Sequence, residues 1–588
     1  MEHISQLYTD PANTNSELTS DNFTKSQILN NYFSSVFIKE PAFDNEAIPT
    51  LIDKDTSPPK LSLDIEQVEA LLKDINPNKS CGPDSVHPRI ISELYQELAL
   101  PFYLIFSSSL SECKIPYQWK QAKVVAIFKK GNKKVAGNYR PISLTSIICK
   151  LLEKLVRNHL MSFMLTNSLI CSTQFGFVEK HSTALQLLHV LYEWSESLEQ
   201  GHYIDCIYLD FRKAFDTVPH NRLIFKLKTY GIDSSLISWI QNYLSDRSQR
   251  VEINKKLSDW KPVLSGIPQG SVLGPFLFLL YINDLPNFVK SSIYLFADDT
   301  KIFREMKSAN DHQILQSDLD SLISWSKKWL LQFNIDKCVT MQIGKNIVEH
   351  KYHIESNGTN FELDSVQNIK DLGIIFDSKL NFEMHMDEKI NKANSLMGII
   401  RRGYSYLNIV NFVPLYKAMV RSYFDYASTI WYPLKKEYVN LVEGTQRRAT
   451  SLVPELKHLS YEGRLRKLNL PSLVYRRLRG DLIEIFKLTH GMYNIDPSTI
   501  IKYRKQSELR TGLRGHDHMI DIMYIKSKSK KHFLPNRTAK LWNSLPIRVV
   551  NALNLNQFKN NLDKLWINQE VLFDFTRDID PSLYSTYQ

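Results

Sequence analysis

The sequence SIYLFADDTKIF, from Ser292 to Phe303, has apolar residues on both sides of an Asp-Asp pair. Two short apolar runs rich in aromatic and β-branched residues, separated by a polar break, predict a β-hairpin with the break at its tip. We therefore expect two buried strands that meet at Asp298 and Asp299. An Asp-Asp pair alone is more often an ordinary turn than a metal site, so this interpretation needs support from elsewhere in the chain.

A second strand candidate, IDCIYLD, ends at Asp210, and the Gly- and Pro-containing loop SGIPQGSVLGP at residues 265–275 lies between it and the hairpin. Three carboxylates that meet repel one another, and such a cluster is tolerable only where cations neutralise it. Hard oxygen ligands select Mg²⁺, and two such ions about 3.5 to 4 Å apart serve in-line displacement at phosphorus. The pattern predicts a two-metal centre formed by Asp210, Asp298 and Asp299.

The chain has 588 residues, of which 43% are apolar, 23% charged and 11% aromatic. Hydrophobic cores stop growing at about 250 to 300 residues, so this length predicts two or three domains. The six cysteines form no CxxC or Cys/His pattern, so neither a disulfide framework nor a zinc site is expected. The N-terminus has no apolar leader, and the most apolar run, Val272 to Ile282, is too short for a bilayer. We expect an intracellular, soluble protein without a membrane partner.

The net charge of +11 is unevenly distributed along the chain. Residues 441–588 carry 25 basic residues (Lys and Arg) and 14 acidic residues (Asp and Glu). Residues 1–440 carry 48 basic and 48 acidic residues. A basic module beside a metal centre suits binding to a phosphate backbone, although a solvated basic face would give the same count. The last quarter of the chain is therefore a candidate nucleic-acid-binding region.

Hydrophobic periodicity predicts the elements around these motifs. Residues 1–60 should form a lead-in with one amphipathic stretch at 26–37, followed by a Pro-containing linker. Helices are expected between Leu61 and about Cys113, in two segments between residues 146 and 200, from Asp311 to Gln332, and throughout the region after about Asp387. Strands are expected at Lys123 to Ile127 and as a pair near MQIG and LGIIF.

Three motifs, LDFRKAFDTV at 209–218, GIPQGSVLGP at 266–275 and FADD at 296–299, occur in the order typical of the palm of reverse transcriptases. Further matching motifs are NYRPISL (138–144), QFGF (174–177), FNIDKC (333–338) and KDLGIIFD (370–377). The chain therefore resembles the reverse transcriptases of non-LTR retrotransposons, LINE-type and Jockey-like. The similarity continues through QRRATSLVPEL (446–456) and YRRLRGDLIEIFKL (475–488).

The resemblance implies an α+β fold of the right-hand polymerase type. Residues 61–380 would form the fingers and a palm with an antiparallel sheet, residues 381–440 a helical thumb, and residues 441–588 a helical, basic C-terminal region that binds nucleic acid. The implied activity is that of an RNA-directed DNA polymerase, which extends a primer 3′-end on an RNA template. The implied partners are an RNA template, a DNA primer or target DNA, and deoxynucleoside triphosphates, in the nucleus or a cytoplasmic ribonucleoprotein.

In this family the three aspartates hold two Mg²⁺ ions, one that activates the primer 3′-hydroxyl and one that holds the β and γ phosphates. By position, Phe215 would be the aromatic gate against a ribose 2′-hydroxyl and would favour deoxynucleotides, with a core aromatic as the alternative. Gln269 and Gly270 would approach the incoming nucleotide and the template. Lys337 would lie near the pyrophosphate, with a surface lysine as its alternative.

The resemblance also implies that basic side chains in the motifs of residues 61–200 bind the triphosphate of the incoming nucleotide. Arg140 lies inside NYRPISL, and its guanidinium suits a bidentate phosphate contact. Lys129, in AIFKKG, would assist it. The family usually has proline where Ala126 stands, so Lys130 is an equal alternative to Lys129.

Two further hypotheses fit the same residues. The first is a catalytically silent retroelement remnant that binds nucleic acid through its basic tail. The second is an RNA-dependent RNA polymerase or an intron-encoded maturase, both of which share the palm chemistry. Because no endonuclease, ribonuclease H or CCHC knuckle is recognisable, we also expect a fragment of a longer element protein.

Overall fold

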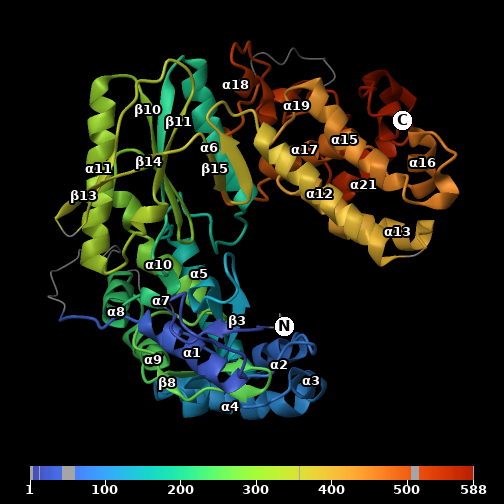
Figure 1. Ribbon diagram of the computed structural model, residues 1–588. Coiled ribbons are helices and arrows are strands. Elements are labelled where there is room, and N and C mark those ends of the chain that lie inside the picture. Colours follow the sequence, from blue (N-terminus) through green and yellow to red (C-terminus); the bar gives the residue numbers. More distant parts are fainter. Residues whose placement is uncertain are drawn as a thin grey trace.

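The computed structural model describes residues 4–11, 13–42, 60–356, 358–404, 406–504 and 516–586. It combines helices and sheets, as predicted for an α+β chain. Figure 1 shows one sheet with its helices in the lower part of the molecule, a second sheet at upper left, and a helical body at upper right. The linker expected within residues 1–60 falls mainly on residues 43–59, which lie outside the described residues.

The predicted hairpin belongs to a five-stranded sheet, called here the aspartate sheet, with the strand order β14-β11-β5-β10-β9. Its strands are β5 Tyr203–Leu209, β9 Ser292–Phe296, β10 Asp299–Met306, β11 Val339–Ile343 and β14 Asp364–Ser365. Strand β10 pairs antiparallel with both β9 and β5. The predicted hairpin and the predicted IDCIYLD strand are therefore direct neighbours.

Helices cover both faces of the aspartate sheet, which explains why β5 is buried along its whole length. Helices α10 Gly274–Ile282 and α11 Ala309–Trp329 share an apolar cluster with Ile302 on one face. Helix α6 Thr183–Glu199 shares a second cluster with Phe303 on the other face. Figure 1 shows α6 and α11 on either side of the strands.

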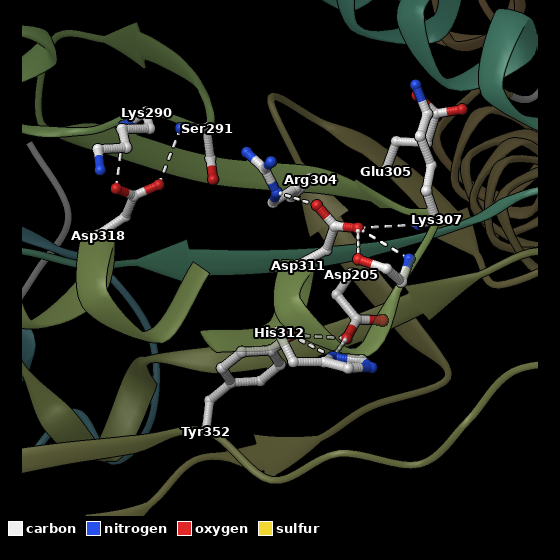
Figure 2. Close-up of polar contacts among 11 residues, drawn as sticks. Asp205, Lys290, Ser291, Arg304, Glu305, Lys307, Asp311, His312, Asp318 and Tyr352 are labelled. Atoms are coloured by element: carbon white, nitrogen blue, oxygen red, sulfur yellow. Dashed lines mark hydrogen bonds and ion pairs between the residues drawn. The ribbon is translucent and has the colours of Figure 1, made fainter. Parts of the chain in front are cut away.

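Helix α11 is tied to the hairpin by two buried aspartates, which are drawn in Figure 2. Asp311 accepts a hydrogen bond of 2.7 Å from Arg304 Nε on β10. Asp318 accepts the backbone N–H groups of Lys290 and Ser291, at 2.9 and 2.8 Å, just before β9 begins. Both strands of the hairpin are thus anchored to a single helix.

The second large sheet, called here the β3 sheet, comprises β3 Gln121–Phe128, β4 Tyr139–Leu144, β6 Ser248–Ile253, β7 Lys256–Leu257 and β8 Lys261–Pro262. Helix α1 Asn22–Ser35, which contains most of the predicted amphipathic stretch, packs on it. Leu29 of α1 shares a cluster with Val124 and Val251 of the sheet. The N-terminal residues that the structure describes are therefore part of this body.

The remaining helices of this body are α2 Ile65–Lys73, α3 Pro88–Glu93, α4 Tyr95–Ser111, α5 Ile147–Thr166, α7 Ala214–Thr217, α8 His220–Thr229 and α9 Ser234–Leu244. Helices α5 and α6 are the two predicted between residues 146 and 200. One apolar cluster joins Leu152 of α5 and Trp239 of α9 to Phe278 of α10 and Leu319 of α11. The two sheet-containing parts therefore share a core.

Helices make up the regular structure from Glu383 onward in the part of the chain that the structure describes, as predicted. They are α12 Glu383–Gly403, α13 Ile409–Leu415, α14 Ser422–Asp425, α15 Lys436–Thr450, α16 Tyr461–Leu468, α17 Leu473–Thr489, α18 Lys528–His532, α19 Leu534–Asn543, α20 Ile547–Val550 and α21 Leu555–Leu565. One apolar cluster runs from Phe303 of the aspartate sheet through Trp431 to Trp542 of α19. The boundary predicted between residues 440 and 441 falls inside α15, whose Val442 belongs to this cluster. Packing therefore does not separate the chain at that point.

Three two-stranded sheets lie outside the large sheets among the described residues, and the first joins β1 Leu7–Tyr8 to β2 Leu18–Thr19. Strand β12 His353–Ser356 pairs with β13 Thr359–Glu362, and β15 Asn368–Asp371 pairs with β16 Ile374–Asp377. The strands predicted near MQIG and LGIIF both exist, as β11 and β16, but the prediction that they pair is wrong. The reason is that β5 and β14 occupy the two edges of β11, while β15 takes β16.

Helix α10, which contains most of the apolar run from Val272 to Ile282, has nine residues. A membrane-spanning helix needs about 20. Across the ranges that the structure describes, no helix is both long and apolar enough to cross a membrane.

The shared core predicts that the C-terminal helices contribute to the stability of the whole helical body. Arg537 of α19 donates to both carboxylate oxygens of Asp481 on α17, at 2.9 and 2.7 Å, and these side chains are 8% and 1% exposed. Arg537→Ala should lower the free energy of unfolding by about 3 to 5 kcal/mol, because it leaves a buried carboxylate unpaired. Urea unfolding followed by circular dichroism measures the loss.

The matched control is Arg466→Ala, which removes the exposed pair with Glu462 on α16. An exposed pair four residues apart on a helix is worth about 0.3 to 0.5 kcal/mol. Equal losses of unfolding free energy in Arg537→Ala and Arg466→Ala would contradict the shared core.

Candidate active site

Strand register brings the three predicted aspartates to one end of the aspartate sheet. Thr300 of β10 pairs with Leu209 of β5, so one further step of this antiparallel register places Asp299 opposite Asp210. Asp298 lies in the turn between β9 and β10, directly before Asp299. Asp210 and Asp299, which are 89 positions apart in the sequence, thus become neighbours through a single strand pairing.

The QFGF motif supports the turn that carries Asp298. Gln174 Oε1 accepts hydrogen bonds from the backbone N–H groups of Gly176, at 2.7 Å, and Ala297, at 3.1 Å. A Cβ on Gly176 would lie 2.3 Å from the nitrogen of Ala297, so only glycine permits this approach. This contact could not be read from the sequence, because it joins residues 123 positions apart.

Burial disfavours the charged forms of Asp298 and Asp299, and repulsion from neighbouring carboxylates adds to this effect. Burial raises the pKa of Asp298, the charge of Asp210 adds to this, and Arg140 and Lys129 oppose it. Partial burial and the charges of Asp298, Asp371 and Asp210 raise the pKa of Asp299 to about 6. The site therefore resists full ionisation when no cation is bound.

Asp210 is paired with a lysine. Lys337 Nζ lies 2.5 Å from Asp210 Oδ2, and both side chains are partly open to solvent. Asp210 is also held through its backbone, since its carbonyl accepts the N–H of Asn334 at 2.7 Å, and the ring of Phe211 stacks on Phe333 at 4.3 Å between centroids. The FNIDKC segment thus delivers Lys337 to the end of β5.

The two cations predicted to bind a triphosphate lie at neighbouring strands of the β3 sheet: Arg140 is on β4, and Lys129 follows the last residue of β3. The backbone N–H of Lys129 donates to the carbonyl of Asn138 at 2.8 Å, just beyond the pairing of Phe128 with Tyr139. Partial burial and the charges of Arg140 and Lys337 lower the pKa of Lys129, and Asp210 opposes this. Lys129 and Arg140 both act on Asp298, so the β3 sheet reaches the aspartates.

The donor set fits a divalent cation by its chemistry. Carboxylate oxygens are the ligands that hard cations prefer, and a cation would remove the repulsion that raises the pKa values of Asp298 and Asp299. The side chains are not yet arranged around a metal: in the part of the chain that the structure describes, no group of three or more His, Cys, Asp or Glu is positioned to hold an ion. Lys337 occupies one oxygen of Asp210 instead.

The Gly- and Pro-containing loop packs between two other motifs. Gln269 Nε2 donates to Asp216 Oδ1 at 2.8 Å, and the carbonyl of Gln269 accepts the N–H of Ser143 at 2.7 Å. Gly270 has φ +119°, and a Cβ there would lie 2.5 Å from the carbonyl oxygen of Ser143. The close approach predicted for Gly270 is therefore at least partly an approach to the NYRPISL strand.

Phe215 is half-buried and packs among aromatic rings. Its ring stacks on Phe278 of α10 at 4.5 Å between centroids and meets Phe177 edge-on at 6.2 Å. Its carbonyl accepts the N–H of Ile267 at 2.7 Å. The packing holds the ring in one orientation between the LDFRKAFDTV and QFGF motifs.

Glu153, which the sequence did not single out, holds the end of the Gly- and Pro-containing loop where α10 begins. Its fully buried carboxylate on α5 accepts the N–H groups of Val272 and Leu273, at 2.7 and 3.0 Å, at the start of α10. Negative charge at a helix N-terminus is favourable, and these N–H groups have no partner within the helix. A lone glutamate on a predicted helix gives no signal for such a contact.

Asp205, the other aspartate of the IDCIYLD segment, lies in a different environment from Asp210. Asp205 lies within β5, whereas Asp210 follows the last residue of that strand. The Asp205 carboxylate accepts hydrogen bonds from Tyr352 at 2.7 Å and from Gln342 at 3.1 Å. It also lies 3.2 Å from Nδ1 of His312 (Figure 2). The side chain is 1% exposed. Asp205 is therefore a satisfied core residue, remote from the turn that carries Asp298.

Residues 127–376 match the family model described as reverse transcriptase (RNA-dependent DNA polymerase). This segment of the chain is therefore similar to reverse transcriptases. All three aspartates, and every other predicted site residue, lie within the matched range. Among curated proteins, similar sequences come from non-LTR retrotransposons, so the predicted resemblance to Jockey-like elements is confirmed.

Three relatives from Drosophila melanogaster illustrate the similarity. The probable RNA-directed DNA polymerase from transposon BS is 27% identical over 75% of this chain and 50% of its own length. The RNA-directed DNA polymerase from mobile element jockey is 31% identical over 56% and 36%, and the probable polymerase from transposon X-element is 27% identical over 66% and 43%. The chain thus spans about half the length of these relatives, or less.

Burial and charge repulsion together predict that the metal-free site destabilises the fold at neutral pH. Asp299 has a pKa of about 6 against an ordinary value of 3.8, so the folded state is penalised once pH rises above 3.8, and fully so above about 6. Asp299→Asn removes the charge, and should raise the melting temperature in EDTA at pH 7.5. The gain should shrink as pH falls from 7 to 4. Differential scanning fluorimetry measures it.

Asp336→Asn is the matched control, because Asp336 is an exposed acid next to Lys337. It should leave the melting temperature unchanged at each pH. The explanation would be contradicted if the melting temperature of Asp299→Asn stayed above that of the wild type at pH 4, or if it were not raised at pH 7.5.

Proposed function

We propose that this chain is the RNA-directed DNA polymerase of a non-LTR retrotransposon, which extends a primer 3′-end on an RNA template by adding deoxynucleotides. The observation that carries the proposal is the register that brings Asp210, Asp298 and Asp299 together inside the matched domain. Two-metal nucleotidyl transfer needs such a set of carboxylates. The substrates are an RNA template, a DNA primer or target DNA, and deoxynucleoside triphosphates.

The parts of the fold are assigned to a right-hand polymerase as follows. The aspartate sheet with α6, α10 and α11 is the palm, and the β3 sheet with its helices is the fingers. Helices α12 to α15 are the thumb, and the helices that follow form the basic C-terminal region, which binds nucleic acid. The charges of Lys129 and Arg140 at Asp298 support this assignment, because they join the fingers to the palm at the nucleotide site.

Lys129 and Arg140 are assigned to the triphosphate of the incoming nucleotide. Lys129 is preferred to Lys130 because its charge acts directly on Asp298. A guanidinium binds phosphate oxygens in pairs, whereas an ammonium acts as a point charge, so the two side chains serve different phosphate positions. Lys337, which pairs with Asp210, is assigned to the pyrophosphate.

Phe215, Gln269 and Gly270 are assigned to the sugar and base of the nucleotide. The Phe215 ring is fixed by Phe278 and Phe177, and a fixed ring can exclude a 2′-hydroxyl by steric contact. The Gln269 side chain is oriented by Asp216, and Gly270 leaves room for the template beside Ser143.

Two Mg²⁺ ions bound by Asp210, Asp298 and Asp299 would lower the pKa of the primer 3′-hydroxyl and stabilise the charge on the pyrophosphate. The protein's own contribution is to hold these carboxylates close to one another against their repulsion. We assign the protein to the nucleus or to a cytoplasmic ribonucleoprotein, where its template and target are found. The alternative of a silent remnant finds no support, because all three aspartates, Gly270 and Phe215 are present.

The test is single-nucleotide extension of a DNA primer on an RNA template by the purified chain with Mg²⁺. Wild-type protein should add deoxynucleotides, and Asp298→Ala should lower the rate by several orders of magnitude, because the carboxylates act as one unit. Single Ala changes at Asp210 and Asp299 should have similar effects. Asp336→Ala serves as the matched surface control and should retain the wild-type rate.

No extension by the wild-type chain, or an unchanged rate in Asp298→Ala, would refute the proposal. The same assay separates the RNA polymerase hypothesis. Ribonucleotides should be poor substrates for the wild type and better substrates for Phe215→Ala. Efficient ribonucleotide addition that is the same in wild type and Phe215→Ala would favour an RNA polymerase.

A further inference from the structure

A carboxylate from the N-terminal part of the chain binds the start of α8. Glu40 accepts hydrogen bonds from the backbone N–H groups of Asn221, at 2.9 Å, and Arg222, at 3.0 Å. The guanidinium of Arg222 donates to the same carboxylate at 3.0 Å, and the Glu40 and Arg222 side chains are 10% and 7% exposed. Pro219, which precedes α8, has no side-chain acceptor for these N–H groups. A residue 182 positions from Arg222 therefore supplies the negative charge that a helix N-terminus favours.

The segment that contains Glu40, residues 36–40, also contacts the Gly- and Pro-containing loop at residues 265–275. The backbone N–H of Ile38 donates to Ser265 Oγ at 2.9 Å. This hydroxyl in turn donates to the carbonyl of Asp216 on α7, also at 2.9 Å, and Ser265 is 1% exposed. The 36–40 segment is thus joined through buried hydrogen bonds to the loop and to the helix that carries Phe215.

Helix α8 holds the same loop from its other end. His220, the first residue of α8, has Nε2 at 2.8 Å from the carbonyl of Gly266, and because a carbonyl only accepts, the imidazole donates. The N–H of Gly266 donates to the carbonyl of Val218 at 2.8 Å, and the next N–H, of Ile267, donates to the carbonyl of Phe215 at 2.7 Å. The position of the α8 N-terminus therefore helps to determine the position of Phe215.

Packing alone does not fix this loop. A cavity lies between α1, the β3 sheet and the loop, and its lining includes Phe33, Phe37, Asp216, Ser265 and Gln269. Protein interiors are close-packed, and a side chain or loop beside a void loses the contacts that would otherwise hold it. The hydrogen bonds from the 36–40 segment and from α8 therefore carry much of the constraint on the loop.

We propose that Glu40 is a positioning residue for nucleotide selection: by fixing the start of α8, it holds the Phe215 ring where that ring excludes a ribose 2′-hydroxyl. The inference rests on the proposed polymerase function and on the assignment of Phe215 to the sugar. Glu40 acts through α8 and the loop and not on the substrate itself. Steric repulsion falls steeply with distance, so a small displacement of the ring would admit the additional hydroxyl.

The metal site should be largely independent of Glu40. Asp210 is held by the pairing of β5 with β10 and by the hydrogen bond from Asn334 to its carbonyl. Loss of Glu40 leaves both of these contacts in place. We therefore expect a change in the discrimination between sugars and in KM, with a smaller change in kcat for deoxynucleotides.

The experiment is single-nucleotide addition by the full-length chain with deoxynucleoside and with ribonucleoside triphosphates. The readout is the ratio of kcat/KM for the two, in the wild type, Glu40→Ala and Glu40→Gln. Glu40→Ala should lower this ratio about 10-fold, because a misplacement of about 1 Å can cost up to about 100-fold. Glu40→Gln keeps the volume and one oxygen acceptor but loses the charge, and should lower the ratio about 2- to 5-fold.

A cycle with Phe215→Ala distinguishes positioning from a general loss of packing. Phe215→Ala should itself lower the ratio, and adding Glu40→Ala should lower it no further, because Glu40 acts through that ring. The burst amplitude gives the active fraction, so partial unfolding lowers the amplitude and leaves the ratio unchanged. If Glu40→Ala does not fold, Glu40→Gln alone and in the Phe215→Ala background decides. An unchanged ratio in the Glu40 variants, or an independent further loss in the double variant, would overturn the inference.

The matched control is Glu17→Ala, which removes an exposed acid from the same N-terminal part of the chain. It should change neither the ratio nor kcat. A wild-type chain that extends no primer would refute the proposed function itself. Primer extension by a wild type whose ratio is matched by Phe215→Ala would refute the assignment of the ring, and the inference with it. Primer extension with a lowered ratio in Phe215→Ala and unchanged ratios in both Glu40 variants would refute only the inference.

Discussion

Repulsion among carboxylates that strand pairing holds together is the constraint on which the rest of the structure depends. The register of β5 and β10 leaves Asp210 and Asp299 no freedom to separate, and the turn places Asp298 beside them. The surrounding structure resists this repulsion: α11 anchors the hairpin, Gln174 holds the turn, and Lys337 pairs with Asp210. Burial and mutual charge still raise the pKa values of Asp298 and Asp299, so the site favours cation binding.

Local patterns in the sequence predicted the elements of this centre well. The apolar runs around FADD became β9 and β10, and IDCIYLD became β5, because a strand buried on both faces reads as a continuous apolar run. The two helices between residues 146 and 200 and the long helix after the hairpin were also correct. The matched reverse transcriptase domain confirms the resemblance drawn from motif order.

Contacts between distant segments could not be predicted from local patterns. The contacts of Glu153 with Val272 and of Gln174 with Ala297 could not be read from the sequence, because each joins residues more than 100 positions apart. The predicted pairing of MQIG with LGIIF failed for the same reason: strand partners are chosen by the whole sheet. The boundary at residue 440 followed a change in charge, whereas the apolar face of α15 continues across it.

The proposed mechanism requires Asp210, Asp298 and Asp299 to act as one centre for two divalent cations. Electron paramagnetic resonance with Mn²⁺, on the chain bound to primer, RNA template and a non-hydrolysable deoxynucleotide, detects such a centre. Two ions should bind with the magnetic coupling of a pair about 3.5 to 4 Å apart, and Asp298→Asn should lose that coupling. Uncoupled Mn²⁺ in the wild type, or a coupled pair that persists in Asp298→Asn, would contradict it.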